Sequence, residues 1–134
     1  MAVRPLVLDS WAMMAFVENE PSAEQVEELL LKAHKAGTPL LMSVVNVGEI
    51  WYSTARAHSP VEADRVIEEL ANLRVEIVPA DWEITRQAAI FKSKGRIAYG
   101  DCFAAALAKL RGAELVTGDP EFKPFAKEVR IFWL

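Results

Sequence analysis

Short apolar runs alternate with longer segments of helical periodicity along the whole chain. Five runs have the length and the apolar content of buried strands. They are Pro5–Leu8, Pro39–Met42, Val75–Val78, Glu114–Thr117 and Val129–Trp133. Strands that alternate with helices favour right-handed crossovers and a mostly parallel sheet with helices on both faces. The pattern therefore predicts an α/β fold.

The segments between these runs carry helix start and stop signals. Ser22 and Gln25 have the spacing of a capping box, as do Ser59 and Glu62, and Pro60 suits the first helical position. Helices are expected from Ser10 to about Glu18, from Ser22 to Gly37, from Ser43 to about Ala57, from Ser59 onward, from Trp82 to about Lys94, and from Asp101 to Gly112.

Composition limits the class of protein. A chain of 134 residues with 52% hydrophobic and 25% charged residues suits one soluble domain over residues 1–134. Its apolar runs are shorter than the roughly 18 residues of a membrane helix, and its N-terminus does not resemble a signal peptide. The single cysteine, Cys102, excludes an internal disulfide. A cytoplasmic protein without membrane association is expected.

Four acidic residues stand where strands end or crossover helices begin. Asp9 ends the first strand, Glu49 lies in the helix after the second, Asp101 heads the helix before the fourth, and Asp119 follows that strand. Open parallel sheets bind ligands beyond the carboxyl ends of their strands, where the strand order reverses. These acids are therefore the candidate site residues.

Three of these acids also have an ordinary structural interpretation. Asp9 and Asp101 could be helix N-caps, because aspartate accepts hydrogen bonds from the free amides of a first turn. Asp119 followed by Pro120 is a favourable pair for an N-cap and the first helical position. Each of the three acids alone is compatible with either interpretation.

Glu49 is too deep in its helix to cap it. Its neighbours in VVNVGEIWY are mostly apolar, where a charged carboxylate is costly unless it is paired or binds a metal. Alternatively, Glu49 belongs to a polar surface face that it shares with Asn46, Ser53 and Arg56.

A shared cation would explain all four acids together. Carboxylates that converge in one crevice repel each other by about 4 kcal/mol per close pair at an intermediate effective dielectric. Ligands that are all oxygen atoms select Mg²⁺ or Mn²⁺ over zinc. The net charge of −4 equals the charge of these four acids, since the other 15 of the 19 acidic residues match the 15 Lys and Arg in number.

The stretches LVLDSWAMMAF, NVGEIWY, GDCFAAALA and VTGDPEF occur in this order and together span nearly the whole chain. In this order they resemble the four acidic motifs of PIN-domain ribonucleases, in particular the VapC toxins of toxin–antitoxin pairs. The resemblance implies a three-layer α/β/α fold whose central parallel sheet has the strand order 3-2-1-4-5. It also implies that Asp9, Glu49, Asp101 and Asp119 hold one or two Mg²⁺ or Mn²⁺ ions.

The same resemblance implies the activity and the partners. The expected reaction is metal-dependent hydrolysis of RNA phosphodiester bonds, which needs no histidine base. His34 and His58 are accordingly expected at the surface. Ser10 and Thr117 are expected to orient ligands or water, although Ser10 could equally be a cap. A VapB-like antitoxin that binds near the early helices and a homodimer are the expected partners.

A small basic cluster precedes Asp101. Lys92, Lys94 and Arg96 could steer RNA toward the acidic site, although the net negative charge argues against a broad basic surface. Alternatively, these cations complement the dipole at a solvated helix end.

Other classes use acids or phosphate-binding loops on similar folds. A receiver domain would need an acidic pair after the first strand, but Ser10 follows Asp9. A haloacid-type phosphatase would need D-x-D, but residue 11 is tryptophan. Glycine-rich phosphate loops are absent from the sequence. A non-catalytic interaction domain of the same fold stays open as an alternative.

Overall fold

The centre of the molecule is a sheet of five parallel strands. A computed structural model describes residues 3–134. The strands are β1 (Leu6–Leu8), β2 (Leu40–Ser43), β3 (Val75–Val78), β4 (Glu114–Thr117) and β5 (Ile131–Trp133). Their order is β3-β2-β1-β4-β5, and every neighbouring pair is parallel. The predicted order 3-2-1-4-5 is confirmed.

This order also decides against one alternative. A receiver domain has the order 2-1-3-4-5, in which the first strand lies beside the third. Here β1 lies between β2 and β4. The receiver-like interpretation is therefore wrong, and the reversal of strand order falls between β1 and β4.

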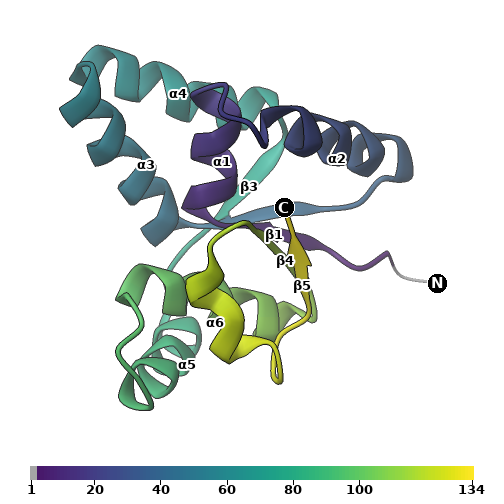
Figure 1. Cartoon of the computed structure of the whole chain (residues 1–134), viewed down its shortest axis with the longest axis vertical. Coiled ribbons are helices and arrows are strands. Elements are labelled where there is room, and N and C mark those ends of the chain that lie inside the picture. Colours follow the sequence, from purple (N-terminus) through teal and green to yellow (C-terminus); the bar gives the residue numbers. More distant parts are fainter. Residues whose placement is uncertain (1–2) are drawn as a thin grey trace.

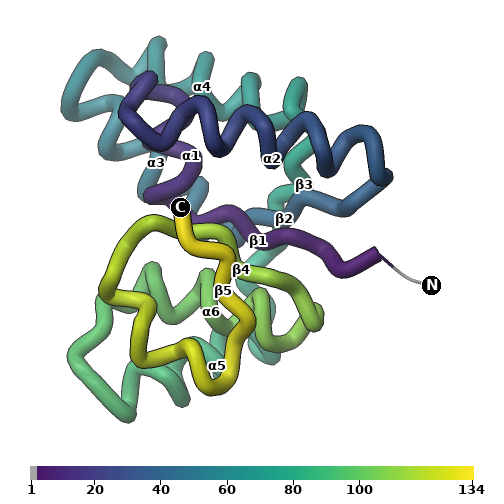
Figure 2. Tube along the Cα trace, turned by 45° about the vertical axis from the view of Figure 1, so that its right-hand side comes forward, coloured from purple at the N-terminus to yellow at the C-terminus, as the bar shows by residue number. Residues whose placement is uncertain are grey.

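Helices cover both faces of the sheet (Figures 1 and 2). One layer holds α1 (Ser10–Val17), α2 (Ala23–Ala36), α3 (Val44–Ala57) and α4 (Pro60–Asn72). The other holds α5 (Trp82–Ser93), α6 (Tyr99–Arg111) and the 3₁₀ helix η1 (Pro120–Phe125). None of the helices within residues 3–134 combines the length and the hydrophobicity that crossing a membrane requires.

The strands separate two cores by their alternation. Val7, Leu41 and Leu115 pack with α5, α6 and η1. Leu8, Met42 and Val116 pack with the layer of α1 to α4. Because successive strand residues face opposite sides, a slip of one residue would exchange the two cores. Burial of a large apolar side chain stabilises the fold by about 1.5–3 kcal/mol, so the register of the strands is strongly specified.

Most predicted helix ends are confirmed. Gly37 and Gly112 end α2 and α6 in the left-handed conformation, with φ of 69° and 59°. The Ser59 side chain accepts a hydrogen bond from the Glu62 amide at 3.1 Å and caps α4. Ser22 stands at the N-cap position of α2 as predicted, but its side chain makes no capping hydrogen bond, so the predicted capping box with Gln25 is wrong. Ser22 has helical backbone angles, whereas a capping side chain needs an extended backbone to bring its oxygen over the next amides.

The position of Asp101 in its helix also differs from the prediction. Helix α6 begins at Tyr99 with Ala98 at the N-cap, and Asp101 is its third residue. The cap interpretation of Asp101 is therefore wrong, and its carboxylate is not engaged with the free amides of the first turn. From Cys102 to Ala108, every residue of α6 is buried, which fixes this helix firmly against the sheet.

Candidate metal centre

Asp9 lies beyond the carboxyl end of β1 and is almost completely buried, with 2% of its surface exposed. One carboxylate oxygen, Oδ1, accepts a hydrogen bond from the Ala12 amide at 2.8 Å, so Asp9 does cap α1. The other, Oδ2, accepts a hydrogen bond from the Thr117 hydroxyl group at 2.5 Å. Because Asp9 is the cap, the alternative that Ser10 caps this helix is wrong.

Thr117 links the residues that follow β1 and β4, the two neighbouring strands between which the strand order reverses. While its hydroxyl group donates to Asp9, the same oxygen accepts a hydrogen bond from the Asp119 amide at 3.0 Å. The side chain is fully buried. A residue at the end of β4 therefore fixes the carboxylate that follows β1 and the backbone of the acid that follows β4.

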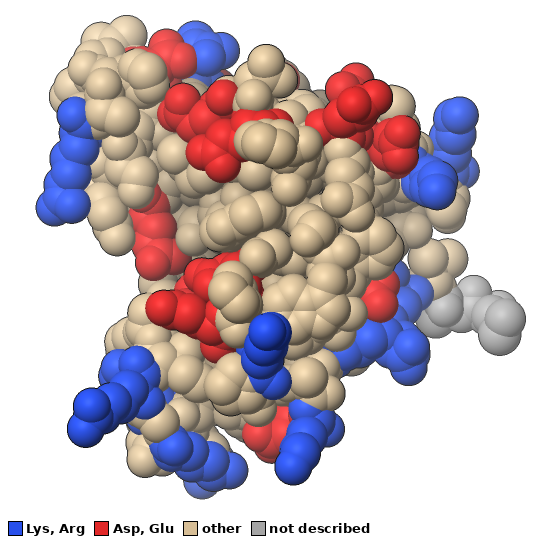
Figure 3. Space-filling model, in the orientation of Figure 1, with Lys and Arg blue, Asp and Glu red and all other residues tan. Residues whose placement is uncertain are grey.

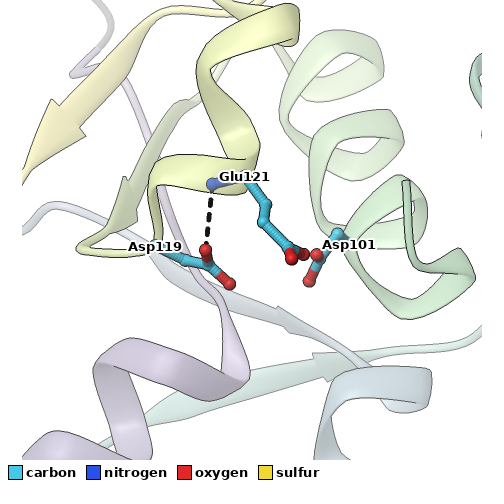
Figure 4. A group of neighbouring side chains, drawn as sticks. All are labelled: Asp101, Asp119 and Glu121. Carbon is cyan, nitrogen blue, oxygen red and sulfur yellow. Dashed lines mark hydrogen bonds between the residues drawn. The ribbon is translucent and has the colours of Figure 1, made fainter. Parts of the chain in front are cut away.

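Asp101, Asp119 and Glu121 form a second group of acids. One carboxylate oxygen from each lies within 4.8 Å of the others. Figure 4 shows the Asp101 and Glu121 carboxylates pointing toward each other from α6 and η1, with Asp119 beside them. Asp119 also caps η1 by accepting a hydrogen bond from the Glu121 amide at 2.9 Å. Glu121 is an addition to the residues predicted from the sequence.

Glu49 extends from α3 toward the same place. Its Oε1 accepts hydrogen bonds from Asn46 Nδ2 at 2.7 Å and from Ser10 Oγ at 3.3 Å. Asn46 is fully buried and also donates to the Gly100 carbonyl at 3.0 Å, one residue before Asp101. The interpretation of Glu49 as part of a polar surface face with Asn46 is therefore wrong.

The electrostatics of the site are strongly unfavourable for anions. Burial raises the pKa of Asp9 to about 7, although its hydrogen bonds from Thr117 and Ala12 act in the opposite direction. Burial, together with the charges of Asp119, Glu49 and Glu121, raises the pKa of Asp101 to about 7. Within residues 3–134, the salt bridges join Glu18 to His58, Glu62 to Arg65 and Lys109 to Glu128, and none of them reaches the site.

These residues fit a hard divalent cation. The donor set consists of carboxylate oxygens, which suit Mg²⁺ and Mn²⁺. The two histidines are exposed elsewhere, as predicted, where His34 bonds the Leu73 carbonyl and His58 lies 3.4 Å from Glu18. Figure 3 shows acidic side chains around a hollow between the two helical layers, with lysine and arginine side chains on the surface below it.

The aromatic ring of Trp11 packs on the backbone beside the site. A Cβ atom at Gly118 would lie 2.2 Å from the ring, so this position accepts only glycine while Trp11 keeps its place. Gly118 directly precedes Asp119. The contact therefore restrains the loop that carries Asp119.

The basic cluster lies apart from these contacts. Lys92, Lys94 and Arg96 are all exposed. Lys92 Nζ donates to the Ile97 carbonyl at 2.6 Å, just beyond the end of α5. Lys92 lies in the last turn of α5, where a cation complements the helix dipole, and RNA steering by the cluster stays a prediction.

The fold and the site together define a class: a three-layer α/β/α protein with acids gathered where its strand order reverses. The PIN domain model matches residues 6–128, and the chain therefore belongs to the PIN domain family. A search of curated proteins finds no match.

Solved structures share this fold at low sequence identity. A chain of DNA-bound VapBC from Salmonella typhimurium has a TM-score of 0.80 at 19% identity, with 97% of this chain and 98% of that chain covered. For promoter-bound VapBC2 from Rickettsia felis the TM-score is 0.73 at 18% identity, with 96% and 98% covered. VapC20 from Mycobacterium tuberculosis, a sarcin-ricin loop cleaving toxin, gives 0.70 at 14% identity, with 89% and 93% covered.

Proposed function

We propose that this protein is a metal-dependent endoribonuclease that hydrolyses RNA phosphodiester bonds, and the toxin of a VapBC-type toxin–antitoxin pair. The single observation that carries the proposal is the cluster of Asp101, Asp119 and Glu121, whose carboxylate oxygens lie within 4.8 Å of one another. Membership in the PIN domain family supports the reaction class. The fold shared with VapBC chains and with a loop-cleaving toxin supports the biological role.

Asp9, Glu49, Asp101 and Asp119 would hold one or two Mg²⁺ or Mn²⁺ ions. Asp101 and Asp119 belong to the cluster, where Glu121 would join them. Glu49 and Asp9 lie outside that cluster, but the charge of Glu49 acts on Asp101, and the charges of Asp101 and Asp119 act on Asp9. A bound divalent cation lowers the pKa of a water molecule and neutralises charge on the phosphoryl group. Other residues of the chain hold these acids in position. Thr117 holds Asp9 and the Asp119 backbone, Ser10 donates to Glu49, and the helices exclude bulk water from Asp9.

The proposed partners are an RNA substrate, a VapB-like antitoxin and a second copy of the chain, with the reaction taking place in the cytoplasm. A groove between α1 and α4 is a candidate antitoxin surface. It is lined by Phe16, Val17, Arg65, Val66 and Glu69. The VapBC complexes among the structural relatives support a partner of this kind.

The test is incubation of the purified protein with total RNA, with and without Mn²⁺, followed by sequencing of the new RNA ends. We expect cleavage at defined sites only in the presence of Mn²⁺. The matched control is Asp101→Asn, which keeps the size of the side chain and removes its charge. Equal cleavage by this variant would point to a contaminating nuclease, and no cleavage by either protein would favour the non-catalytic interaction domain.

A further inference from the structure

The Glu49 carboxylate is held asymmetrically. Its Oε1 accepts hydrogen bonds from α1 through Ser10 and from α3 through Asn46. In the part of the chain that the structure describes, no hydrogen bond reaches its Oε2. We propose that Asn46 is a positioning residue that fixes Glu49 through Oε1, so that Oε2 is kept for a divalent cation. The inference rests on the proposed function and assigns a role to a residue outside the four acids.

The orientation of the Asn46 amide follows from its neighbours. Glu49 Oε1 and the Gly100 carbonyl oxygen are both acceptors, so the amide nitrogen must face them with its two N–H groups. The Asn46 carbonyl oxygen is then left buried, without a hydrogen-bond partner among residues 3–134. Buried unpaired acceptors are rare in proteins. An apolar residue would fill this buried position without that cost, so packing alone does not account for an asparagine.

Asn46 connects two parts of the site that are distant in the sequence. It joins Glu49 on its own helix to the Gly100 carbonyl, 54 residues away, in the first turn of α6. The next residue is Asp101, whose pKa the Glu49 charge helps to raise. Glu49 and Asp101 repel each other, and one buried amide opposes their separation by binding both elements.

The backbone of Gly100 packs directly against the Glu49 carboxylate. A Cβ atom at this position would lie 2.3 Å from Glu49 Oε2, and the other atoms it would meet also belong to the Glu49 carboxylate. The backbone of Gly100 is helical and needs no positive φ. A methyl group there would thus displace the end of a flexible side chain and leave the helix intact.

The first experiment is calorimetric titration of the full-length protein with Mn²⁺. Asn46→Leu, which keeps the branching at Cγ and removes both donors, should weaken Mn²⁺ binding about tenfold or more, as is usual for partners of metal ligands. Thr54→Val is the matched control, because Thr54 is also buried on α3 with an unpaired oxygen. The Thr54→Val control should bind Mn²⁺ like the wild type and, without metal, melt at or above the wild-type temperature. Metal-free Asn46→Leu should melt lower, because Glu49 Oε1 and the Gly100 carbonyl both lose the donor that holds them.

The second experiment asks whether Asn46 acts through Glu49. In a double-mutant cycle with Glu49→Gln, the double variant should bind Mn²⁺ no more weakly than Glu49→Gln alone. Additive losses would overturn the proposal. In RNA cleavage, Asn46→Leu should need about tenfold more Mn²⁺ for half-maximal rate, while the maximal rate at saturating Mn²⁺ stays close to wild type.

A separate pair of variants makes the test independent of the folding of Asn46→Leu. Gly100→Ala should also weaken Mn²⁺ binding about tenfold, whereas Gly48→Ala, where a Cβ meets nothing within 4 Å, should not. An unchanged affinity of Gly100→Ala for Mn²⁺ would overturn the proposal that the position of the Glu49 carboxylate matters for metal binding. Unchanged affinity in Glu49→Gln would instead overturn Glu49 as a metal ligand and, with it, that part of the proposed function.

Discussion

Asp9 and Asp101 both have a pKa of about 7, but their surroundings differ. Asp9 is buried, and each of its carboxylate oxygens accepts a hydrogen bond from its own fold. Asp101 is half-buried, and the charged groups that act on it are Asp119, Glu49 and Glu121. Asp9 therefore stabilises the fold through its own hydrogen bonds, whereas Asp101 is surrounded by other acids, whose repulsion a bound cation would offset on the proposed function.

The largest expected effect comes from Asp101→Asn. On the proposed function this variant loses a metal ligand, so Mn²⁺-dependent RNA cleavage should fall by about 1,000-fold or more, since metal-ion catalysis contributes several kcal/mol. The metal-free variant should be as stable as the wild type or more stable, because a repulsion is relieved and no helix cap is lost. Cleavage assays check the loss of activity, and thermal melts with EDTA check the stability. A strongly lowered melting temperature would show that the Asp101 carboxylate stabilises the fold, as Asp9 does.

The second effect concerns pH. The pKa of Asp9 is raised from 3.8 to about 7, so its contribution to stability is complete below pH 4 and is lost as the pH rises through 7. Urea unfolding of the metal-free protein should give about 2–3 kcal/mol less stability at pH 8 than at pH 5 from this group. Asp9→Asn should flatten this slope, and Mn²⁺ should oppose it by binding the ionised acids. A slope that is unchanged in Asp9→Asn would show that other groups cause it.

A smaller effect is expected from Thr117→Val. The variant removes the hydroxyl group that donates to Asp9 and accepts from the Asp119 amide. Hydrogen bonds to charged groups contribute about 1.5–3 kcal/mol, so we expect a loss of about 1.5 kcal/mol at pH 8. The Thr117 hydrogen bond lowers the pKa of Asp9, and the pH-dependent fall in stability should therefore move to higher pH. No movement would mean that the hydroxyl group does not contact the carboxylate in solution.

The smallest effect is expected for the basic cluster. Lys94→Ala combined with Arg96→Ala should slow RNA cleavage a few-fold and flatten its dependence on salt, because fewer cations meet phosphates. Lys32→Ala combined with Lys35→Ala, two exposed positions on α2, is the control of equal charge. Equal cleavage kinetics of the two double variants would show that Lys94 and Arg96 do not steer RNA, and would leave only the interpretation that they complement the dipole at the helix end.

The alternation of strands and helices was sufficient to predict an α/β fold from the sequence. Pattern did not determine the strand order, which came from the resemblance of the four motifs. Helix ends were predictable at Gly37 and Gly112, where a left-handed residue is needed. The start of α2 after Ser22 was also predictable, but the capping box was not, because the preceding turn sets the backbone angles of Ser22 and residue type alone does not reveal them.

The site was less accessible to sequence reasoning than the fold. Asp9, Glu49, Asp101 and Asp119 lie in motifs, but Asn46 looked like a surface residue because its burial depends on α6, more than 50 residues later. Its spacing of three residues from Glu49 on one helix was the available signal. Glu121 looked like an ordinary acid in a first helical turn, and only the approach of α6 to η1 makes it a neighbour of Asp101.

The central place of β1 has a consequence for how the protein is made. The neighbour of β1 that brings Thr117 and Asp119 is synthesised more than 100 residues after Asp9. A nascent chain that ends before Tyr99 contains Asp9 and Glu49 but lacks both later acids. On the proposed function, a ribosome that has not yet added Asp101 and Asp119 therefore carries a harmless polypeptide, and the capacity to cut RNA arises only after β4 and the residues that follow it have been made.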